Sequence, residues 1–177
     1  MTDLPGTMEK QLRSLGFTLI ELIVVMVVLG ILAAVFVPRS NNPAIILSTQ
    51  AEQLAGDIRF LQSLAMTQGW SGTAPTVRRY RVNFTATSYN FTDLSGVAVA
   101  HPSGTTGSIA FAGGVSISPF PPANLPNGLV AFDGLGMPYT NAAGTTALAS
   151  VAAITLVSAG SNRALQIYPV TGLVRLP

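Results

Sequence analysis

The stretch FTLIELIVVMVVLGILAAVFV, residues 17–37, decides the fold of this chain of 177 residues. It is apolar almost without interruption and carries one charged side chain, that of Glu21. At about 1.5 Å per residue, a helix over this stretch is roughly 31 Å long, which matches the hydrocarbon core of a bilayer. Pro38 and Arg39 close the run, because proline interrupts a helix and arginine prefers the aqueous interface. We therefore expect a transmembrane helix over residues 17–37.

The flanking residues distinguish this stretch from a secretory signal peptide. A signal peptide carries its small-residue cleavage site after the apolar run, whereas here the small residue, Gly16, comes before it. Inside the run, a carboxylate costs about 2.5 to 3.5 kcal/mol on insertion into a membrane. We therefore expect Glu21 to have a specific partner, and the structural alternative is a side chain that snorkels to the nearby interface.

The residues Gly16-Phe17-Thr18-Leu19-Ile20-Glu21, followed by the apolar run, resemble the class III signal of type IV pilins and of the pseudopilins of type II secretion. The resemblance implies that a prepilin peptidase cuts between Gly16 and Phe17 and N-methylates Phe17, and that Glu21 is needed for assembly with other pilins. Cleavage would create an α-ammonium group at Phe17. Glu21 of a neighbouring subunit can pair with this group, which offsets the burial of both charges.

The resemblance also predicts the domain organisation. Residues 1–16 are a prepilin leader that begins at Met1 or Met8, and residues 17–37 cross the bacterial inner membrane once. Residues 38–68 continue the same spine helix after a kink, and residues 69–177 form a β-rich periplasmic domain. The mature protein is expected to join a filament or pseudopilus.

Composition agrees with an exported, membrane-anchored protein. Hydrophobic residues make up 49% of the chain and charged residues only 9%, and there is no cysteine. The chain therefore offers no disulfide framework and no thiol chemistry. The net charge is +2, and loss of residues 1–16 leaves it unchanged because they carry two acidic and two basic side chains. This slight excess is far from that of a dedicated nucleic-acid-binding protein.

Beyond the apolar run, the sequence predicts a second helix packed on a sheet. Asn42 is expected as its N-cap and Pro43 as its first residue, and the helix runs to about Gln68. Its apolar positions are spaced four, three, four, three and four residues apart on one stripe. These are Leu47, Ala51, Leu54, Ile58, Leu61 and Ala65. We expect the opposite, solvent-facing side to carry Gln50, Glu52, Gln53, Asp57 and Gln62.

From Thr76 onward, short alternating runs separated by turn residues replace the helical period. Residues 77–86 and 89–94 predict a hairpin with Tyr80, Val82 and Phe84 on its core face and Arg79, Arg81 and Asn83 on the other. Further strands are expected at 97–100, 108–112, 115–118, 129–132, 151–158, 164–170 and 173–176. The fold class is therefore α+β and pilin-like, with a long N-terminal spine helix against an antiparallel sheet domain.

The C-terminal part of the chain resembles the GspH/FimT-type pseudopilins. That family has a Phe-x-x-x-Gly-x-Pro turn before a final hairpin that carries Thr-Gly. The corresponding residues here are Phe132, Gly136, Pro138, Thr171 and Gly172. The resemblance covers the N-terminal helix and the helix that follows it, but hardly extends to residues 70–128.

The sequence carries no recognisable catalytic, metal-binding or cofactor motif. His101 is the only histidine, and its neighbours Pro102 and Gly104 favour a loop residue over a base or a ligand. The acidic residues of the mature domain are scattered, whereas metal sites need clusters of ligands. We therefore expect a protein that is not an enzyme and has no cofactor and no metal.

One basic cluster, Arg78-Arg79-Tyr80-Arg81, raises the alternative of DNA binding, because arginine and aromatic side chains can bind phosphates and stack on bases. FimT-type minor pilins take part in DNA uptake, and their DNA-binding members resemble one another in a C-terminal Gly-Arg-x-Arg segment. This chain has Gly172-Leu173-Val174-Arg175, so that only Arg175 corresponds. The solvated face of a strand explains the cluster better, and we do not expect nucleic acid as a partner.

The function expected from the sequence is that of a minor pseudopilin, a structural subunit in the tip or initiation complex of a filament. The machine could be a type II secretion system, a type IV pilus or a pilus of the mannose-sensitive haemagglutinin type. The alternative is a DNA-binding minor pilin of a competence system.

Overall fold

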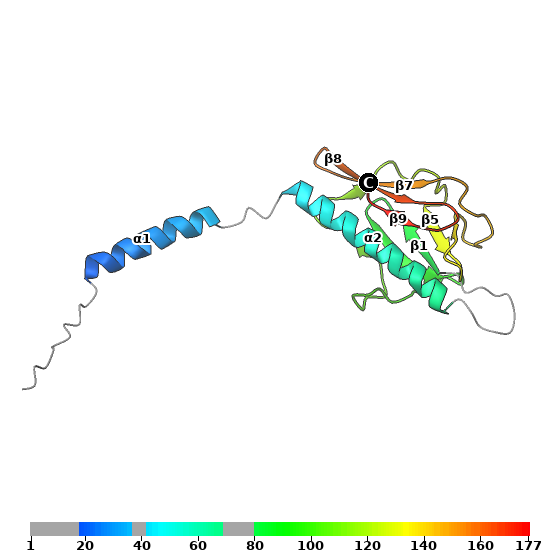
Figure 1. Cartoon of the computed structure of the whole chain (residues 1–177), viewed down its shortest axis with the longest axis horizontal. Helices are drawn as coiled ribbons and strands as arrows, with labels where there is room; N and C mark the ends of the chain where they lie inside the picture. Colours follow the sequence, from blue (N-terminus) through cyan, green and yellow to red (C-terminus); the bar gives the residue numbers. More distant parts are fainter. Residues whose placement is uncertain (1–17, 37–41, 69–79) are drawn as a thin grey trace, which may run out of the picture. The chain divides into compact units, whose positions relative to one another are not determined.

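The computed structural model describes residues 18–36, 42–68 and 80–177. The described residues fall into two compact units. One unit holds the N-terminal helix α1, Leu19–Phe36. The other holds the second helix α2, Pro43–Gln68, and all of the strands (Figure 1).

Helix α1 begins at a side-chain cap. Thr18 precedes the first helical residue, and its Oγ1 accepts a hydrogen bond of 3.3 Å from the backbone N–H of Glu21. A threonine cap with glutamate three residues later is the sequence pattern of a capping box, so the cap explains where the helix begins. None of the helices in the described ranges 18–36, 42–68 and 80–177 has the length and hydropathy needed to cross a membrane.

Helix α2 starts where the sequence predicts. Asn42 Oδ1 accepts a hydrogen bond of 3.0 Å from the backbone N–H of Ala44, and Pro43 occupies the first turn. The continuation expected from residue 38 is not described before Asn42, because residues 37–41 lie outside the described residues. The predicted apolar stripe is confirmed, since all six of its members are buried. The expectation that Asp57 faces solvent is wrong, because its side chain is buried on the side of α2 that packs on the sheets.

The strands form two antiparallel sheets rather than a single one. The five-stranded sheet has the order β3-β2-β1-β5-β6, and the four-stranded sheet has the order β4-β7-β8-β9. The strand bounds are β1 Tyr80–Phe84, β2 Ser88–Asp93, β3 Ile109–Ala110, β4 Ser116–Ile117, β5 Leu129–Phe132, β6 Pro138–Tyr139, β7 Ala152–Ser158, β8 Ser161–Ile167 and β9 Val174–Arg175. Helix α2 packs against β1, β5, β7, β8 and β9, and it therefore covers both sheets (Figure 1).

Most predicted strands are present, although several are shorter or shifted. The hairpin of β1 and β2 is confirmed, with Tyr80, Val82 and Phe84 buried and Arg81 and Asn83 on the other face. The strand expected at 97–100 is wrong, because only one isolated bridge, between Thr92 and Ala98, forms there. Strand β6 was not predicted, since Pro138 and the nearby Gly136 resemble a turn. The strand expected at 164–170 starts three residues earlier, where it pairs with β7 as a long hairpin.

One continuous apolar core joins the helix to both sheets. It combines the buried apolar positions of α2 with inward-facing residues of the strands, among them Val82, Phe132 and Ile154. This core holds α2 in a fixed place on the sheets, so that the polar side chains along α2 have fixed partners.

Candidate functional site

Glu21 lies in the first turn of α1 with an exposed side chain. A carboxylate here interacts favourably with the positive end of the helix dipole. Within the described residues, the Glu21 carboxylate makes no hydrogen bond or ion pair, so it remains available to a partner from outside this part of the chain. The predicted cleavage site between Gly16 and Phe17, with the predicted methylation site at Phe17, lies outside the described residues.

Four of the five residues named in the C-terminal pattern, Phe132, Gly136, Thr171 and Gly172, lie together at one point on α2. Gln62 Nε2 donates hydrogen bonds to the carbonyl oxygens of Gly136, at 3.0 Å, and of Thr171, at 2.9 Å. Phe132 is buried beside them, and Gly172 packs directly against the carbonyl group of Gly136. The pattern therefore reflects a packing requirement that joins the turn before β6 and the turn after β8 to α2. The sequence did not reveal Gln62 as the residue that holds both turns.

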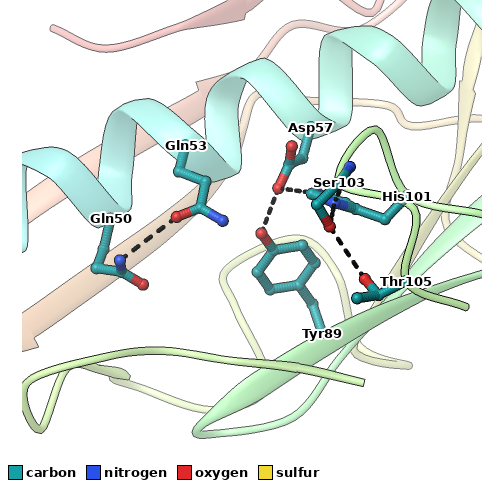
Figure 2. Close-up of polar contacts among 7 residues, drawn as sticks. All are labelled: Gln50, Gln53, Asp57, Tyr89, His101, Ser103 and Thr105. Atoms are coloured by element: carbon teal, nitrogen blue, oxygen red, sulfur yellow. Dashed lines mark hydrogen bonds and ion pairs between the residues drawn. The ribbon is translucent and has the colours of Figure 1, made fainter. Parts of the chain in front are cut away.

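A second polar cluster lies under α2, around Asp57. Tyr89 Oη, from β2, donates a short hydrogen bond to Asp57 Oδ2, and His101 Nε2 lies 2.7 Å from the same oxygen. Figure 2 shows the carboxylate between the two side chains. The His101 contact has the distance of an ion pair but not the angle of a hydrogen bond, since Nε2 has no partner in hydrogen-bond geometry. The expectation that His101 is a loop residue is correct, but the side chain is buried rather than exposed.

The partners of His101 fix its tautomer. Nδ1 accepts a hydrogen bond of 3.1 Å from the backbone N–H of Ser103, so the proton of a neutral ring lies on Nε2, which faces Asp57. Ser103 Oγ lies 2.7 Å from the same Nδ1 and 3.1 Å from Thr105 Oγ1. Burial, followed by the hydrogen bond to Asp57, raises the pKa of the Tyr89 hydroxyl far above its ordinary value. Tyr89 therefore stays protonated and acts as a donor to Asp57.

The order Asp57, His101, Ser103 resembles the relay that activates a serine nucleophile. Two features favour a structural role instead. Ser103 donates its own backbone N–H to the nitrogen that would have to accept the hydroxyl proton, and Asp57 shares its oxygen with Tyr89. We therefore interpret the cluster as a structural contact that holds strand β2 and the loop around His101 against α2.

Removing the Asp57 carboxylate tests this structural role. We expect Asp57→Ala to lower the free energy of unfolding by about 3 kcal/mol, because it leaves the Tyr89 hydroxyl and the His101 ring buried without their shared acceptor. Glu52→Ala, on the exposed side of the same helix, is the control and should change stability by about 0.5 kcal/mol or less. Urea denaturation of both variants makes the comparison. Equal, small effects would show that Asp57 is only tolerated in the core.

The structure does not gather the candidate DNA-binding arginines into one described surface. Arg81 lies on the outer face of the five-stranded sheet, where its Nε donates to Thr92 Oγ1 at 2.8 Å. Arg175 is exposed on β9 of the other sheet. Arg163, in β8, shares a face with buried Leu165, while Arg175 pairs with Gln166 on the opposite face. Arg78 and Arg79 lie outside the described residues.

Within residues 18–36, 42–68 and 80–177, no group of three or more histidine, cysteine, aspartate or glutamate side chains lies close enough to hold a metal ion. In this part of the chain, the Asp57 and His101 pair thus has no third histidine, cysteine, aspartate or glutamate beside it.

Comparison with known proteins gives one match. Residues 12–37 match the family model described as the prokaryotic N-terminal methylation motif. No curated protein and no solved structure matches the chain. The matched residues contain the predicted cleavage site and Glu21, and the match supports a type IV pilin or pseudopilin. The antiparallel sheets packed against a helix are compatible with a pilin-like fold.

Proposed function

We propose that this protein is a minor pseudopilin of the GspH/FimT type, a structural subunit that acts in the tip or initiation complex of a type II secretion or type IV pilus filament. The observation that carries the proposal is the match of residues 12–37 to the N-terminal methylation motif. The convergence of the C-terminal pattern residues on Gln62 supports the finer assignment, because it gives that pattern a packing role in this fold.

In this proposal, the apolar run of residues 17–37 anchors the unassembled subunit in the inner membrane, with the β-rich domain in the periplasm. A prepilin peptidase removes residues 1–16 and methylates Phe17. The available Glu21 carboxylate then pairs with the terminal ammonium group of a neighbouring pilin, since each charge is costly to bury alone in an apolar environment. We propose no enzymatic activity, and we assign Asp57 and His101 to stability.

Leader removal tests the proposal. On co-expression with a prepilin peptidase, we expect the chain to be shortened at Gly16, and we expect Gly16→Leu to retain the leader because a bulky side chain no longer fits the cleavage site. Gly16→Ala is the matched control and should still be cut. Gel mobility of the three proteins, with and without the peptidase, reports the outcome. A full-length wild-type chain in the presence of active peptidase would contradict the proposal.

The positions of three described arginines, Arg81, Arg163 and Arg175, favour a protein that does not bind DNA. Arg81 and Arg175 lie on separate sheets and Arg163 lies on the face of β8 opposite to Arg175, so these three described arginines do not form one phosphate-binding surface. We therefore expect no electrophoretic shift of duplex DNA by residues 42–177 at near-physiological salt, where phosphate contacts are already weakened by counterions. A salt-sensitive shift that disappears in Arg175→Gln would instead support a competence pilin.

A further inference from the structure

Strand β8 has one side that its neighbouring strand covers only in part. On one side, every residue of β8 from Ser161 to Ile167 pairs with β7. On the other side, β9 pairs only with Gln166 and Ile167, and the two residues that follow β9 form no bridge with β8. In the described part of the chain, residues 161–165 are therefore an open strand edge, which we call the β8 edge.

The hydrogen-bond pattern of the β7–β8 hairpin shows which backbone groups point to the β8 edge. Ser161 directly follows a two-residue turn, so it exchanges backbone hydrogen bonds with its partner on β7. Bonded positions then alternate, which directs the backbone groups of Asn162 and Ala164 away from β7. Tyr168 follows the same alternation, because its N–H donates on the β9 side to the carbonyl oxygen of Leu173 at 2.9 Å. Among the described residues, the N–H and C=O groups of Asn162 and Ala164 have no backbone partner.

Two other strands show how this fold covers an edge. Along β2, beyond the short strand β3, the N–H of Val99 donates to the carbonyl oxygen of Phe91 at 3.0 Å. Along β7, beyond the short strand β4, the N–H of Ser118 donates to the carbonyl oxygen of Thr155 at 2.9 Å. Uncovered edges pair readily with a further strand. The β8 edge is therefore available to a strand from outside the described chain.

Arg163 places a positive charge at the centre of the β8 edge. Its side chain is exposed and has no hydrogen bond or ion pair to another described residue. Opposite charges that face each other across two strands are favourable, whereas like charges are unfavourable. Two-fold pairing of two β8 edges about Arg163 would bring the two arginines face to face. The charge therefore favours a partner strand with a carboxylate over a second copy of the same edge.

We propose that the β8 edge binds an extended segment of a partner protein, which adds a strand in line with β9 and places an aspartate or glutamate opposite Arg163. The added strand runs antiparallel to β8, as β9 does, and bonds to the backbone groups of Asn162 and Ala164. Leu165 lies on the same face as Arg163 and is buried, so an apolar residue fits two positions from the carboxylate. The inference goes beyond the proposed function and does not rest on it, because the β8 edge belongs to the folded domain with or without residues 1–16.

A synthetic peptide tests the inference on the full-length chain in detergent micelles. The probe is acetyl-Thr-Val-Thr-Glu-Thr-Val-Thr-amide, which carries valine and glutamate on one face and threonine on the other. At a concentration about ten times its Kd, the probe should slow amide hydrogen exchange about tenfold at Asn162 and Ala164, as measured by NMR. Ser161 and Arg163, whose amides already bond to β7, should change less. Unchanged exchange at Asn162 and Ala164, or equal slowing at all four amides, would overturn the proposal.

Modified probes separate strand pairing from ionic attraction. N-methylation of the two threonines beside the glutamate removes the N–H groups that point to β8, so this probe should not bind. N-methylation of the glutamate leaves those groups intact and should keep binding within about threefold of the unmodified probe. Replacement of the glutamate by lysine should weaken binding about tenfold, the effect of roughly 1.4 kcal/mol. Equal binding of all of these probes would contradict a strand pairing that is selected by charge.

Variants of the chain supply the matching controls. Arg163→Glu should reverse the preference, so that the lysine probe binds more tightly than the glutamate probe. Arg163→Gln should weaken binding of the glutamate probe, whereas Arg175→Gln, which also removes one exposed positive charge, should not. Ala164→Pro removes an N–H that points to the β8 edge and none that bonds to β7, so the hairpin should be kept and binding lost. A glutamate probe that binds Arg163→Glu as tightly as the unsubstituted chain would overturn the proposal.

Discussion

Gly172→Ala is expected to lower the free energy of unfolding by about 3 kcal/mol, a cost in the range of severe packing substitutions. A Cβ atom at this position would overlap the carbonyl oxygen of Gly136 and lie 2.6 Å from Gln62 Nε2. The backbone φ of +63° is also unfavourable for any residue with a side chain. The substitution therefore displaces the turns that Gln62 holds against α2.

Gly160→Ala separates the two contributions to that cost. Gly160 has a similar positive φ of +81°, but nothing lies within 4 Å of its Cβ position. It should cost only about 1 kcal/mol, the expense of the left-handed conformation alone. Thermal or urea unfolding of both variants measures the difference. Equal effects would show that the meeting point of Gly136 and Gly172 is not a packing constraint.

Glu21→Val is expected to leave membrane association intact and to abolish co-assembly with partner pilins. Valine removes a charge that is costly in an apolar environment, so the anchor should insert at least as well. Assembly should fail because the terminal ammonium group of the neighbouring subunit loses its partner. Membrane fractionation and recovery in sheared filaments measure the two effects separately.

Glu21→Gln distinguishes this role from helix capping. Glutamine is also accepted three residues after a threonine cap, so the start of α1 at Thr18 should be kept. If the charge matters, Glu21→Gln should fail to assemble like Glu21→Val. Normal assembly of Glu21→Gln would instead assign Glu21 to the cap.

The sequence predicts the helices well because their signals are local. The cap at Asn42, the spacing of the α2 apolar positions and the alternation in β1 each specify a face directly, and the structure confirms all three. Strands such as β3, β4 and β9 have only two residues each, so their bounds depend on pairing partners far away in the chain. The division into two sheets depends on the same distant pairings.

The polar sites under α2 were harder to predict for a related reason. Asp57 lies three residues after Leu54 and four before Leu61, so its spacing already placed it beside the buried stripe. The negative charge of Asp57 favours a solvent-facing position. Tyr89 and His101, which are distant in the sequence, reach Asp57 only in the folded chain. Likewise, Gly136 and Thr171 lie far apart in the sequence, and Gln62 donates hydrogen bonds to both of their carbonyl oxygens only because both turns reach α2 in the folded chain.

The most direct test of the account is the mass of the N-terminal peptide of the protein isolated from membranes that contain an active prepilin peptidase. For a processed pilin subunit, we expect a peptide that begins at Phe17 and carries one additional methyl group on its α-amino nitrogen. A peptide that begins before Gly16, or an unmethylated terminus formed by cleavage within the apolar run, would contradict it.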